Sequence, residues 1–254
     1  MSELHVRVDG SGRDVVLLHG WGFHSGAWSG IAEALAARYR VRRVDLPGHG
    51  LSAAPPPAHF DAAADEVARC IPAGSVVAGW SLGGLFAQRI AALSPGHLAG
   101  LLLVSATPCF VARGDWADAM AAATLEGFAR ELEADPARTM EQFVHLNVLG
   151  GARPRETARA FLQRLREVPS PAPAALRTGL HWLQRTDLRS SAAEISTRCV
   201  VLHGARDRVT PAGAGRWLAR EIPGAEMIEV EDAAHLPFAT HPQRFIEAVE
   251  RVHG

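Results

Sequence analysis

A serine flanked by glycines is the residue of this sequence with the clearest chemical use. Ser81 stands in Gly79–Gly83 (GWSLG), directly after the apolar run Ser75–Gly79 and before a segment with helical spacing. A G-x-S-x-G pattern between a strand and a helix makes a tight turn that exposes the serine hydroxyl. Glycine is needed there because side chains would collide with the neighbouring strand and helix. The pattern therefore predicts Ser81 as a catalytic nucleophile.

An acid and a base for this serine are found further along the chain. A serine hydroxyl is a weak nucleophile at neutral pH and needs a base, which an acid must orient. Asp207 follows the apolar run Cys199–His203, and His235 follows the run Glu226–Val230. The order Ser, then Asp or Glu, then His is typical of one α/β architecture. We therefore expect Asp207 as the acid and His235 as the base.

Other residues compete for these two roles. Asp187 and Asp232 are alternative acids, and His203 is an alternative base, although its place at the end of an apolar run favours a packing role. The sequence has no H-E-x-x-H motif, its histidine spacing does not converge, and no G-x-G-x-x-G follows the first apolar run. We therefore expect neither a metal nor a nucleotide cofactor.

The segment His19–Gly22 (HGWG) is placed to stabilise a reaction intermediate. It follows the apolar run Asp14–Leu18. In this architecture a loop after an early strand supplies one backbone N–H of the oxyanion hole, and the residue after the nucleophile supplies the other. We expect these donors to be the N–H groups of Trp21 and Leu82. The indoles of Trp21 and Trp80 would lie near the nucleophile, with core packing as the alternative.

These residues need a sheet that brings their loops together. Short apolar runs recur, and segments with helical spacing, such as 30–39 and 84–93, separate them; the remaining runs are Val41–Asp45 and Leu101–Ser105. Continuous apolar runs fit strands buried on both faces of a parallel sheet. The alternation predicts a doubly wound α/β fold, in which chemistry lies at the carboxyl ends of the strands.

The middle of the chain has a different pattern. Between residues 109 and 187 apolar residues recur at helical spacing, and Pro136, Pro154 and the proline-rich stretch 169–173 interrupt them. We expect about four helices here, inserted as a cap (residues 109–187) into one α/β core made of residues 1–108 and 188–254.

Composition excludes several classes of protein. The 254 residues are 48% hydrophobic with a net charge of −1, which excludes a disordered chain and gives no general signal for nucleic acid. All 26 basic residues are arginine, so no lysine can form a Schiff base. No apolar run is long enough for a membrane span, the first residues lack the apolar stretch of a secretory signal, and three isolated cysteines favour a reducing compartment. A cytoplasmic monomer is expected.

Several of these motifs together resemble the α/β-hydrolase family. The resemblance spans nearly the whole chain and rests on His19–Gly22, Asp45–Ser52 (DLPGHGLS), Gly79–Gly84, Gly204–Asp207 and Ala234-His235. It implies a mostly parallel sheet with an inserted helical cap. Family members that are epoxide hydrolases or haloalkane dehalogenases carry Asp at the position of Ser81, so the resemblance implies an esterase-type hydrolase instead.

Further segments resemble those of one group within this family, the esterases of biotin synthesis that remove the methyl group from pimeloyl-acyl-carrier protein methyl ester. These are Trp80, Ser105–Phe110 with Arg113–Trp116, and Arg138–Phe143. The resemblance implies an acyl site lined by Trp21, Leu82 and the stretch Phe143, Val144, His145, Leu146 and Asn147. It also implies that Arg138, Arg155 and Arg159 on the cap receive the acidic acyl carrier protein. Gln142 stands where the family can carry a further arginine.

Charge on the cap also favours an acidic partner. Residues 150–170 hold five arginines and two glutamates, with Arg155 and Arg159 one helical turn apart. A solvated helix face is the alternative interpretation. Two other functions stay open: a small-molecule carboxylesterase, lactonase or carbon–carbon bond hydrolase with the same three residues, and a non-catalytic ligand-binding protein.

Overall fold

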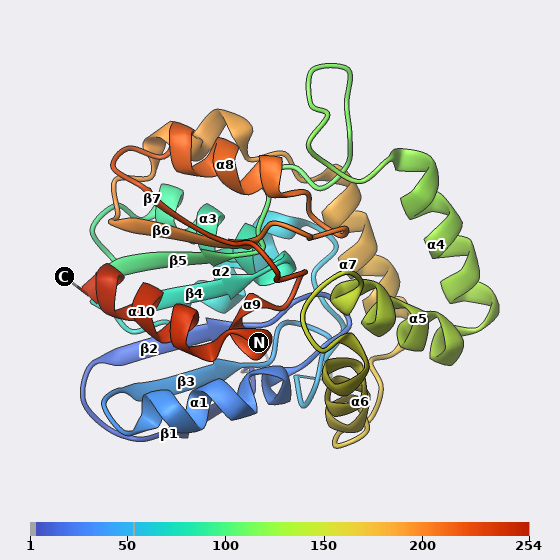
Figure 1. Ribbon diagram of the computed structural model, residues 1–254, viewed down its shortest axis with the longest axis horizontal. Coiled ribbons are helices and arrows are strands. Elements are labelled where there is room, and N and C mark those ends of the chain that lie inside the picture. Colours follow the sequence, from blue (N-terminus) through green and yellow to red (C-terminus); the bar gives the residue numbers. More distant parts are fainter. Residues whose placement is uncertain (1–3, 53, 254) are drawn as a thin grey trace.

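A seven-stranded sheet forms the centre of the protein in the computed structural model, which describes residues 4–52 and 54–253 (Figure 1). The strand order is β1-β3-β2-β4-β5-β6-β7. Only β1 runs antiparallel to its neighbour. The strands are β1 (Val6–Asp9), β2 (Asp14–Leu18), β3 (Arg40–Val44), β4 (Val76–Trp80), β5 (Gly100–Val104), β6 (Cys199–Gly204) and β7 (Glu226–Val230). The predicted α/β fold is confirmed.

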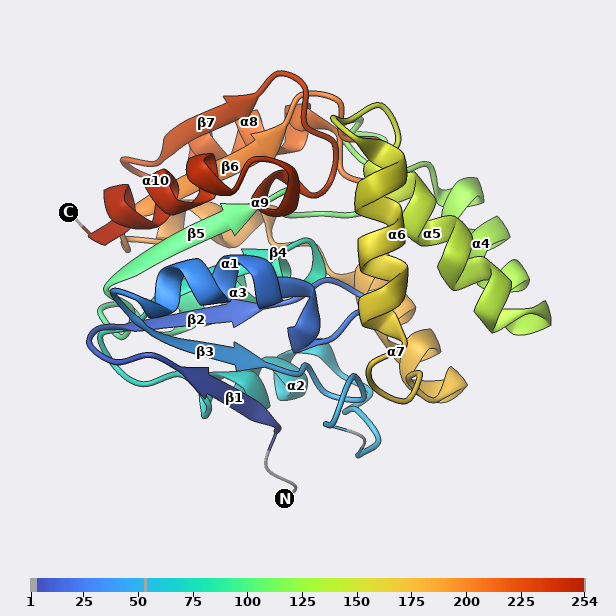
Figure 2. The same ribbon diagram turned by 60° about the horizontal axis from the view of Figure 1, so that its bottom comes forward.

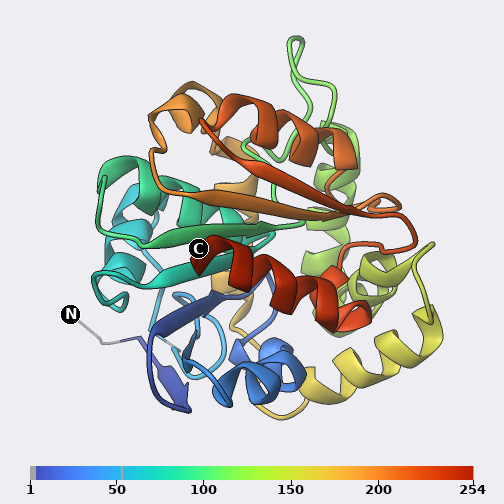
Figure 3. The same cartoon turned by 60° about the vertical axis from the view of Figure 1, so that its left-hand side comes forward.

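Helices cover both faces of the sheet. One face carries α1 (Ser29–Ala36), α9 (Pro237–Thr240) and α10 (Pro242–His253), and Figure 3 shows α10, in red, lying along the sheet. The other face carries α2 (Phe60–Ala68), α3 (Leu82–Leu93) and α8 (Ala212–Glu221). Every residue of β4, β5 and β6 is buried, which explains why these strands are continuous apolar runs.

The strand β1 was not predicted from the sequence. It is a four-residue strand at the edge of the sheet, and its two central residues are exposed. Its alternating sequence, VRVD, lacks the continuous apolar run that marks the buried strands.

Four helices lie together beyond the carboxyl ends of the strands (Figure 2). They are α4 (Ala122–Ala134), α5 (Pro136–Val148), α6 (Pro154–Leu165) and α7 (Pro173–Arg185). A proline occupies the first turn of α5, α6 and α7, where no N–H bond is lost. The Asp135 side chain caps α5 by accepting a hydrogen bond from the N–H of Arg138 at 3.1 Å. We call α4–α7 the cap helices.

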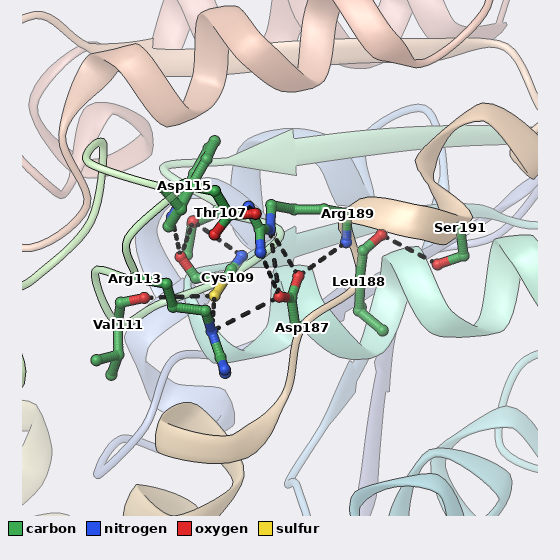
Figure 4. A network of polar contacts seen from close by, with 10 residues as sticks. Thr107, Cys109, Val111, Arg113, Asp115, Asp187, Leu188, Arg189 and Ser191 are labelled. Carbon is green, nitrogen blue, oxygen red and sulfur yellow. Dashed lines mark hydrogen bonds and ion pairs between the residues drawn. The ribbon is translucent and has the colours of Figure 1, made fainter.

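The two segments that join the cap helices to the sheet lie side by side (Figure 4). Cys109 and Asp187 form an antiparallel bridge, and the N–H of Leu188 donates to the carbonyl of Pro108 at 2.8 Å. The Arg189 guanidinium binds both carboxylate oxygens of Asp187, and these hydrogen bonds lower the pKa of that carboxyl. The division into a core and a cap at residues 109 and 187 stays a prediction.

In the described part of the chain, no helix combines the length and apolar character that crossing a membrane requires.

Candidate active site

The turn between β4 and α3 holds Ser81 in a strained conformation. Its φ is 55° and its ψ is −115°, in a region that side chains rarely adopt. The N–H of Ser81 donates to the carbonyl of Val104 at 3.1 Å, which ties the turn to β5. A Cβ at Gly79 would overlap the backbone of Gly83, and a Cβ at Gly83 would overlap the carbonyl of Leu18. Only glycine fits at these two positions, as the sequence pattern predicted.

The structure brings the expected acid and base together. Asp207 lies in the loop after β6, and His235 lies in the loop after β7. The Nδ1 atom of His235 is 2.8 Å from Oδ2 of Asp207, and both side chains are buried. With Nδ1 bound to the carboxylate, the lone pair of the neutral imidazole is on Nε2.

Several donors hold the Asp207 carboxylate in its ionised form. Oδ1 accepts the N–H groups of Val209 and Thr210 at 2.9 Å each, so the side chain closes its own turn. Burial by itself raises the pKa of the Asp207 carboxyl, but the charges and hydrogen bonds of His235 and His203 outweigh burial and hold it well below its usual range. The carboxylate is therefore an anion that stabilises a protonated His235.

His235 is oriented through its backbone as well as its ring. Its carbonyl accepts a hydrogen bond from the Trp80 indole at 3.0 Å, and the two rings lie 5.7 Å apart. Because Trp80 directly precedes Ser81, this bond places the His235 loop beside the nucleophile turn. Within the described residues, the Nε2 atom of His235 is buried without a hydrogen-bond partner. The bond to the Ser81 hydroxyl is not formed in this structure; such bonds often tighten only when substrate binds.

The residues that competed for these roles have other partners. Asp187 binds Arg189 at the base of the cap helices, and Asp232 lies 2.9 Å from the imidazole of His241. His203 is wholly buried under α8. Thr210 was missed in the sequence: its hydroxyl lies 3.0 Å from Asp207 and 3.3 Å from Nδ1 of His235. A threonine three residues after an aspartate carries no specific sequence signal.

The loop after β2 is held by a neutral histidine. The N–H of Leu46 donates to Nε2 of His19 at 2.9 Å, so Nδ1 carries the proton and donates to the carbonyl of Gly20 at 2.8 Å. Burial lowers the pKa of His19 to about 3, and the nearby His49 adds to the shift. The neutral tautomer therefore fixes the backbone just before Trp21.

Both expected oxyanion donors lack an internal hydrogen-bond partner. Within the described residues, the backbone N–H groups of Trp21 and Leu82 have no hydrogen-bond acceptor. The Leu82 N–H is at the start of α3, where the helix dipole adds positive potential. The close approach of Gly83 to the Leu18 carbonyl brings the two loops into contact.

The Trp21 indole joins the core to the cap helices. Its N–H donates to the carbonyl of Leu176 at 2.9 Å, and its ring packs edge-on against Phe128 and Phe143. Trp80 is buried among aromatic rings of the core, including Phe23 and Phe238. Both indoles are therefore packed, and they border the loops that carry Ser81 and the oxyanion donors.

The stretch 143–147 of α5 is split between two faces. Phe143, Val144 and Asn147 are buried, Leu146 is half-buried, and His145 is exposed. A helix turns by about 100° per residue, so five consecutive side chains cannot line one cavity. That this stretch lines the acyl site stays a prediction, and the exposed side chain of His145 lies on the opposite face of α5 from the buried ones.

The last turn of α5 and the loop that follows it are hydrogen-bonded to both loops that carry the acid and the base. The carbonyl of Asn147 accepts the N–H of His235 at 3.0 Å, and the carbonyl of Gly150 accepts the Arg206 guanidinium at 3.2 Å. The N–H of Ala152 donates to the carbonyl of Asp232 at 2.9 Å. We call these three contacts the latch. Through the latch, the cap helices help to position His235.

A groove of about 1030 Å³ opens between α5, α6 and the loop that leads to α7. Its apolar walls include Met140, Leu162 and Leu165, and it reaches Phe23 beside the loop after β2 that carries Trp21, which we call the oxyanion loop after its expected role. Arg138 lines it and is exposed. None of Ser81, Asp207 and His235 lines this groove, which touches the loop after β2 at Gly22 and Phe23.

Arg155 and Arg159 lie on α6 with exposed side chains. Their neighbours Arg153 and Arg164 are engaged, the first with Glu156 at 3.9 Å and the second over the ring of Phe161. In the described ranges, neither Arg155 nor Arg159 has an acidic side chain within 4.0 Å. These two cations are therefore free to meet an external partner.

Known proteins match the chain over nearly its full length. The model of the alpha/beta hydrolase family matches residues 15–248. The chain is similar to a pimeloyl-[acyl-carrier protein] methyl ester esterase of Nitrosomonas europaea, at 38% identity over 98% of this chain and 99% of the relative. It is also similar to the protein of the same name from Chromobacterium violaceum, at 42% identity over 97% of this chain and 96% of the relative.

Solved structures agree on the fold. An esterase from Exiguobacterium antarcticum has a TM-score of 0.88 at 22% identity, covering 99% of this chain and 96% of its own. The enol-lactonase from Burkholderia xenovorans has a TM-score of 0.85 at 23% identity, covering 98% and 95%. With the strained turn at Ser81 and the full-length family match, the chain belongs to the alpha/beta hydrolase family.

Proposed function

We propose that this chain is a serine esterase that hydrolyses the methyl ester of pimeloyl-acyl-carrier protein to methanol and free pimeloyl-acyl-carrier protein in biotin synthesis. The observation that carries the chemistry is the buried contact of 2.8 Å between His235 and Asp207, in a loop that the Trp80 indole ties to the Ser81 turn. The proposed substrate is the one named for relatives that match nearly the whole chain.

In the proposed reaction, the Ser81 hydroxyl attacks the ester carbonyl while Nε2 of His235 takes its proton. Asp207 keeps the imidazole in the correct tautomer and stabilises its cation. The N–H groups of Trp21 and Leu82 bind the oxyanion. His235 then protonates the leaving methoxide, methanol departs, and water cleaves the acyl-enzyme by the reverse proton path.

Carrier docking is proposed for Arg138, Arg155 and Arg159. The side chains are exposed, and Arg155 and Arg159 lack internal acidic partners among the described residues. Contacts of exposed arginines with an acidic protein mainly raise the association rate and weaken with salt. Gln142 is exposed on α5 and contributes no charge to this surface.

The groove supports this arrangement. The methyl ester lies at the far end of the acyl chain from the carrier, so the cap helices must admit a long, mostly apolar chain. The groove has apolar walls, Arg138 lines it, and it reaches the oxyanion loop at Gly22 and Phe23. We assign it as the path of the acyl chain and its arm.

Charge reversal on α6 tests the carrier. In the double variant Arg155→Glu/Arg159→Glu we expect kcat/KM for pimeloyl-acyl-carrier protein methyl ester to fall by about tenfold or more, since two attractive contacts become repulsive. Hydrolysis of p-nitrophenyl acetate should not change. Arg220→Glu on α8, also an exposed arginine, is the matched control.

The outcomes separate the open functions. If the double variant hydrolyses the carrier-bound ester at the wild-type rate, the carrier proposal fails and a small-molecule hydrolase is favoured. If the wild-type protein hydrolyses no ester at all, a non-catalytic binding protein is favoured. Ester hydrolysis that is lost in Ser81→Ala would favour a serine esterase. Restoration of biotin-independent growth in cells that lack the esterase step tests the role in the cell.

A further inference from the structure

A second histidine lies against the Asp207 carboxylate. His203 is the fifth residue of β6, four positions before Asp207, and is wholly buried. Its Nε2 atom is 3.4 Å from Oδ2 of Asp207, the same oxygen that binds His235. The reaction proposed above leaves this buried imidazole without a role.

The hydrogen bonds of His203 define which nitrogen carries the proton. Nε2 lies 2.8 Å from the carbonyl of Thr210, an acceptor only, so Nε2 must donate. In the described part of the chain, Nδ1 has no partner. A Cβ at Gly215 of α8 would lie 2.5 Å from Nδ1, so α8 closes that side of the ring. The Nε2–H group therefore donates to the Thr210 carbonyl, and the Asp207 carboxylate lies beside the same nitrogen at 3.4 Å.

Both contacts act on the turn that presents the acid. The N–H of Thr210 holds Oδ1 of Asp207, while its carbonyl is held by His203. The Thr210 hydroxyl reaches the carbonyl of Ser105 at 2.9 Å, one strand away. His203 therefore fixes the far end of the turn and also contacts the carboxylate itself.

The charged neighbours of His203 come from β7, α8 and the loops after β6 and β7. Asp207 and His235 lie in the loops after β6 and β7. Glu229 of β7 is its partner in the strand register, and Arg216 of α8 binds both carboxylate oxygens of Glu229 at 2.8 and 2.6 Å. Because Glu229 is neutralised by Arg216, Asp207 is the nearby anion that the Nε2–H group can affect.

We propose that His203 is a positioning residue for the triad acid: it fixes the Thr210 end of the turn that presents Asp207, and its polar Nε2–H group, close to Oδ2, sets how tightly His235 holds its proton. The proposal rests on the assignment of Ser81, Asp207 and His235 as the catalytic residues. It does not depend on the carrier-bound substrate.

The sign of the effect follows from the charge on Oδ2. Without the donor, Oδ2 is more negative and stabilises protonated His235 more strongly. The base then stays protonated to higher pH, so the acidic limb of the kcat/KM profile moves to higher pH. A tenfold change in the protonation equilibrium of His235 corresponds to about one pH unit.

Two amide variants test this role. Gln places an amide N–H near the position of Nε2, whereas Asn is too short to reach Asp207. We expect His203→Asn to move the half-maximal pH of kcat/KM up by about one unit, and His203→Gln to keep it near the wild-type value. The assay is p-nitrophenyl acetate hydrolysis from about pH 5 to 9, with folding checked by far-UV circular dichroism.

The proposal is overturned if the limb does not move in His203→Asn, or if it moves equally in both variants, because a packing role predicts no rescue by Gln. If neither variant folds, nitrogen-15 NMR of the wild-type imidazoles decides: a proton on Nε2 of His203 supports the proposal and a proton on Nδ1 refutes it. A wild type without esterase activity refutes the proposed function instead, and the NMR result still judges the geometry.

Discussion

Acid should destabilise this protein through two buried histidines under the oxyanion loop. Burial lowers the pKa of His19 to about 3 and that of His49 to about 4, and the two rings lie 5.5 Å apart. In the unfolded chain the pKa of both is near the ordinary histidine value of 6.5. Between these values only the unfolded state binds the protons, so stability is present above about pH 6.5 and is lost as the pH falls.

The size of the loss follows from the difference in pKa. Going from about pH 7.5 to pH 5, each histidine lowers the free energy of unfolding by roughly 2 kcal/mol, or about 4 kcal/mol for the pair. Urea unfolding followed by tryptophan fluorescence at both pH values measures this loss. His49→Asn removes one titrating ring and keeps a donor for the Pro47 carbonyl, which Nδ1 contacts at 3.0 Å. In that variant the loss should fall to about 2 kcal/mol.

The control is His181→Asn, which changes an exposed histidine of α7 and should keep the full pH dependence. The reasoning is refuted if wild type loses less than about 1 kcal/mol over this range, or if His49→Asn is as acid-sensitive as wild type. The consequence for activity is direct. A proton on Nε2 of His19 would displace the N–H of Leu46 and disturb the loop that presents Trp21.

Three further substitutions test the site and its frame. Asp207→Asn should lower kcat for p-nitrophenyl acetate on the order of 10³–10⁴-fold with little change in KM, because the amide favours the wrong His235 tautomer; a loss below about tenfold would contradict the assignment. Gly83→Ala should cost about 1–3 kcal/mol in urea unfolding, since its Cβ overlaps the Leu18 carbonyl, and wild-type stability would show that the turn relaxes freely. Arg189→Ala should cost about 1 kcal/mol in low salt and less in 1 M NaCl, and a loss independent of salt would argue against an ionic role.

The sheet and the candidate catalytic residues were accessible from sequence because their signals are local. Buried parallel strands are continuous apolar runs, and β4 to β6 are buried at every residue. The chain order of Ser81, Asp207 and His235 then follows from the strand ends. By contrast, β1 lies at the edge with a short alternating pattern and gave no comparable signal.

The contacts around these residues could not be predicted, because they join segments far apart in the chain through backbone atoms. The bond from the Trp80 indole to the His235 carbonyl spans 155 positions. Arg206 reaches the carbonyl of Gly150 across 56 positions. Every residue has the same backbone carbonyl, so no pattern of residue types predicts which carbonyl will accept such a bond. Which side chains of α5 face inward likewise depends on how the helix packs on the rest of the protein, which the sequence pattern does not show.

The latch has a consequence for evolution and engineering. Cap regions are natural units to exchange between relatives when substrate preference is to change. In this protein the carbonyl of Asn147 accepts a hydrogen bond from the backbone N–H of His235, so the end of α5 helps to hold the proposed base in place. A chimera with a new cap and a different α5–α6 connection would gain a different substrate pocket. It would also lose the hydrogen bond that holds the loop of His235. Successful grafts should therefore retain the native residues from 147 to 152 and vary the helices on either side.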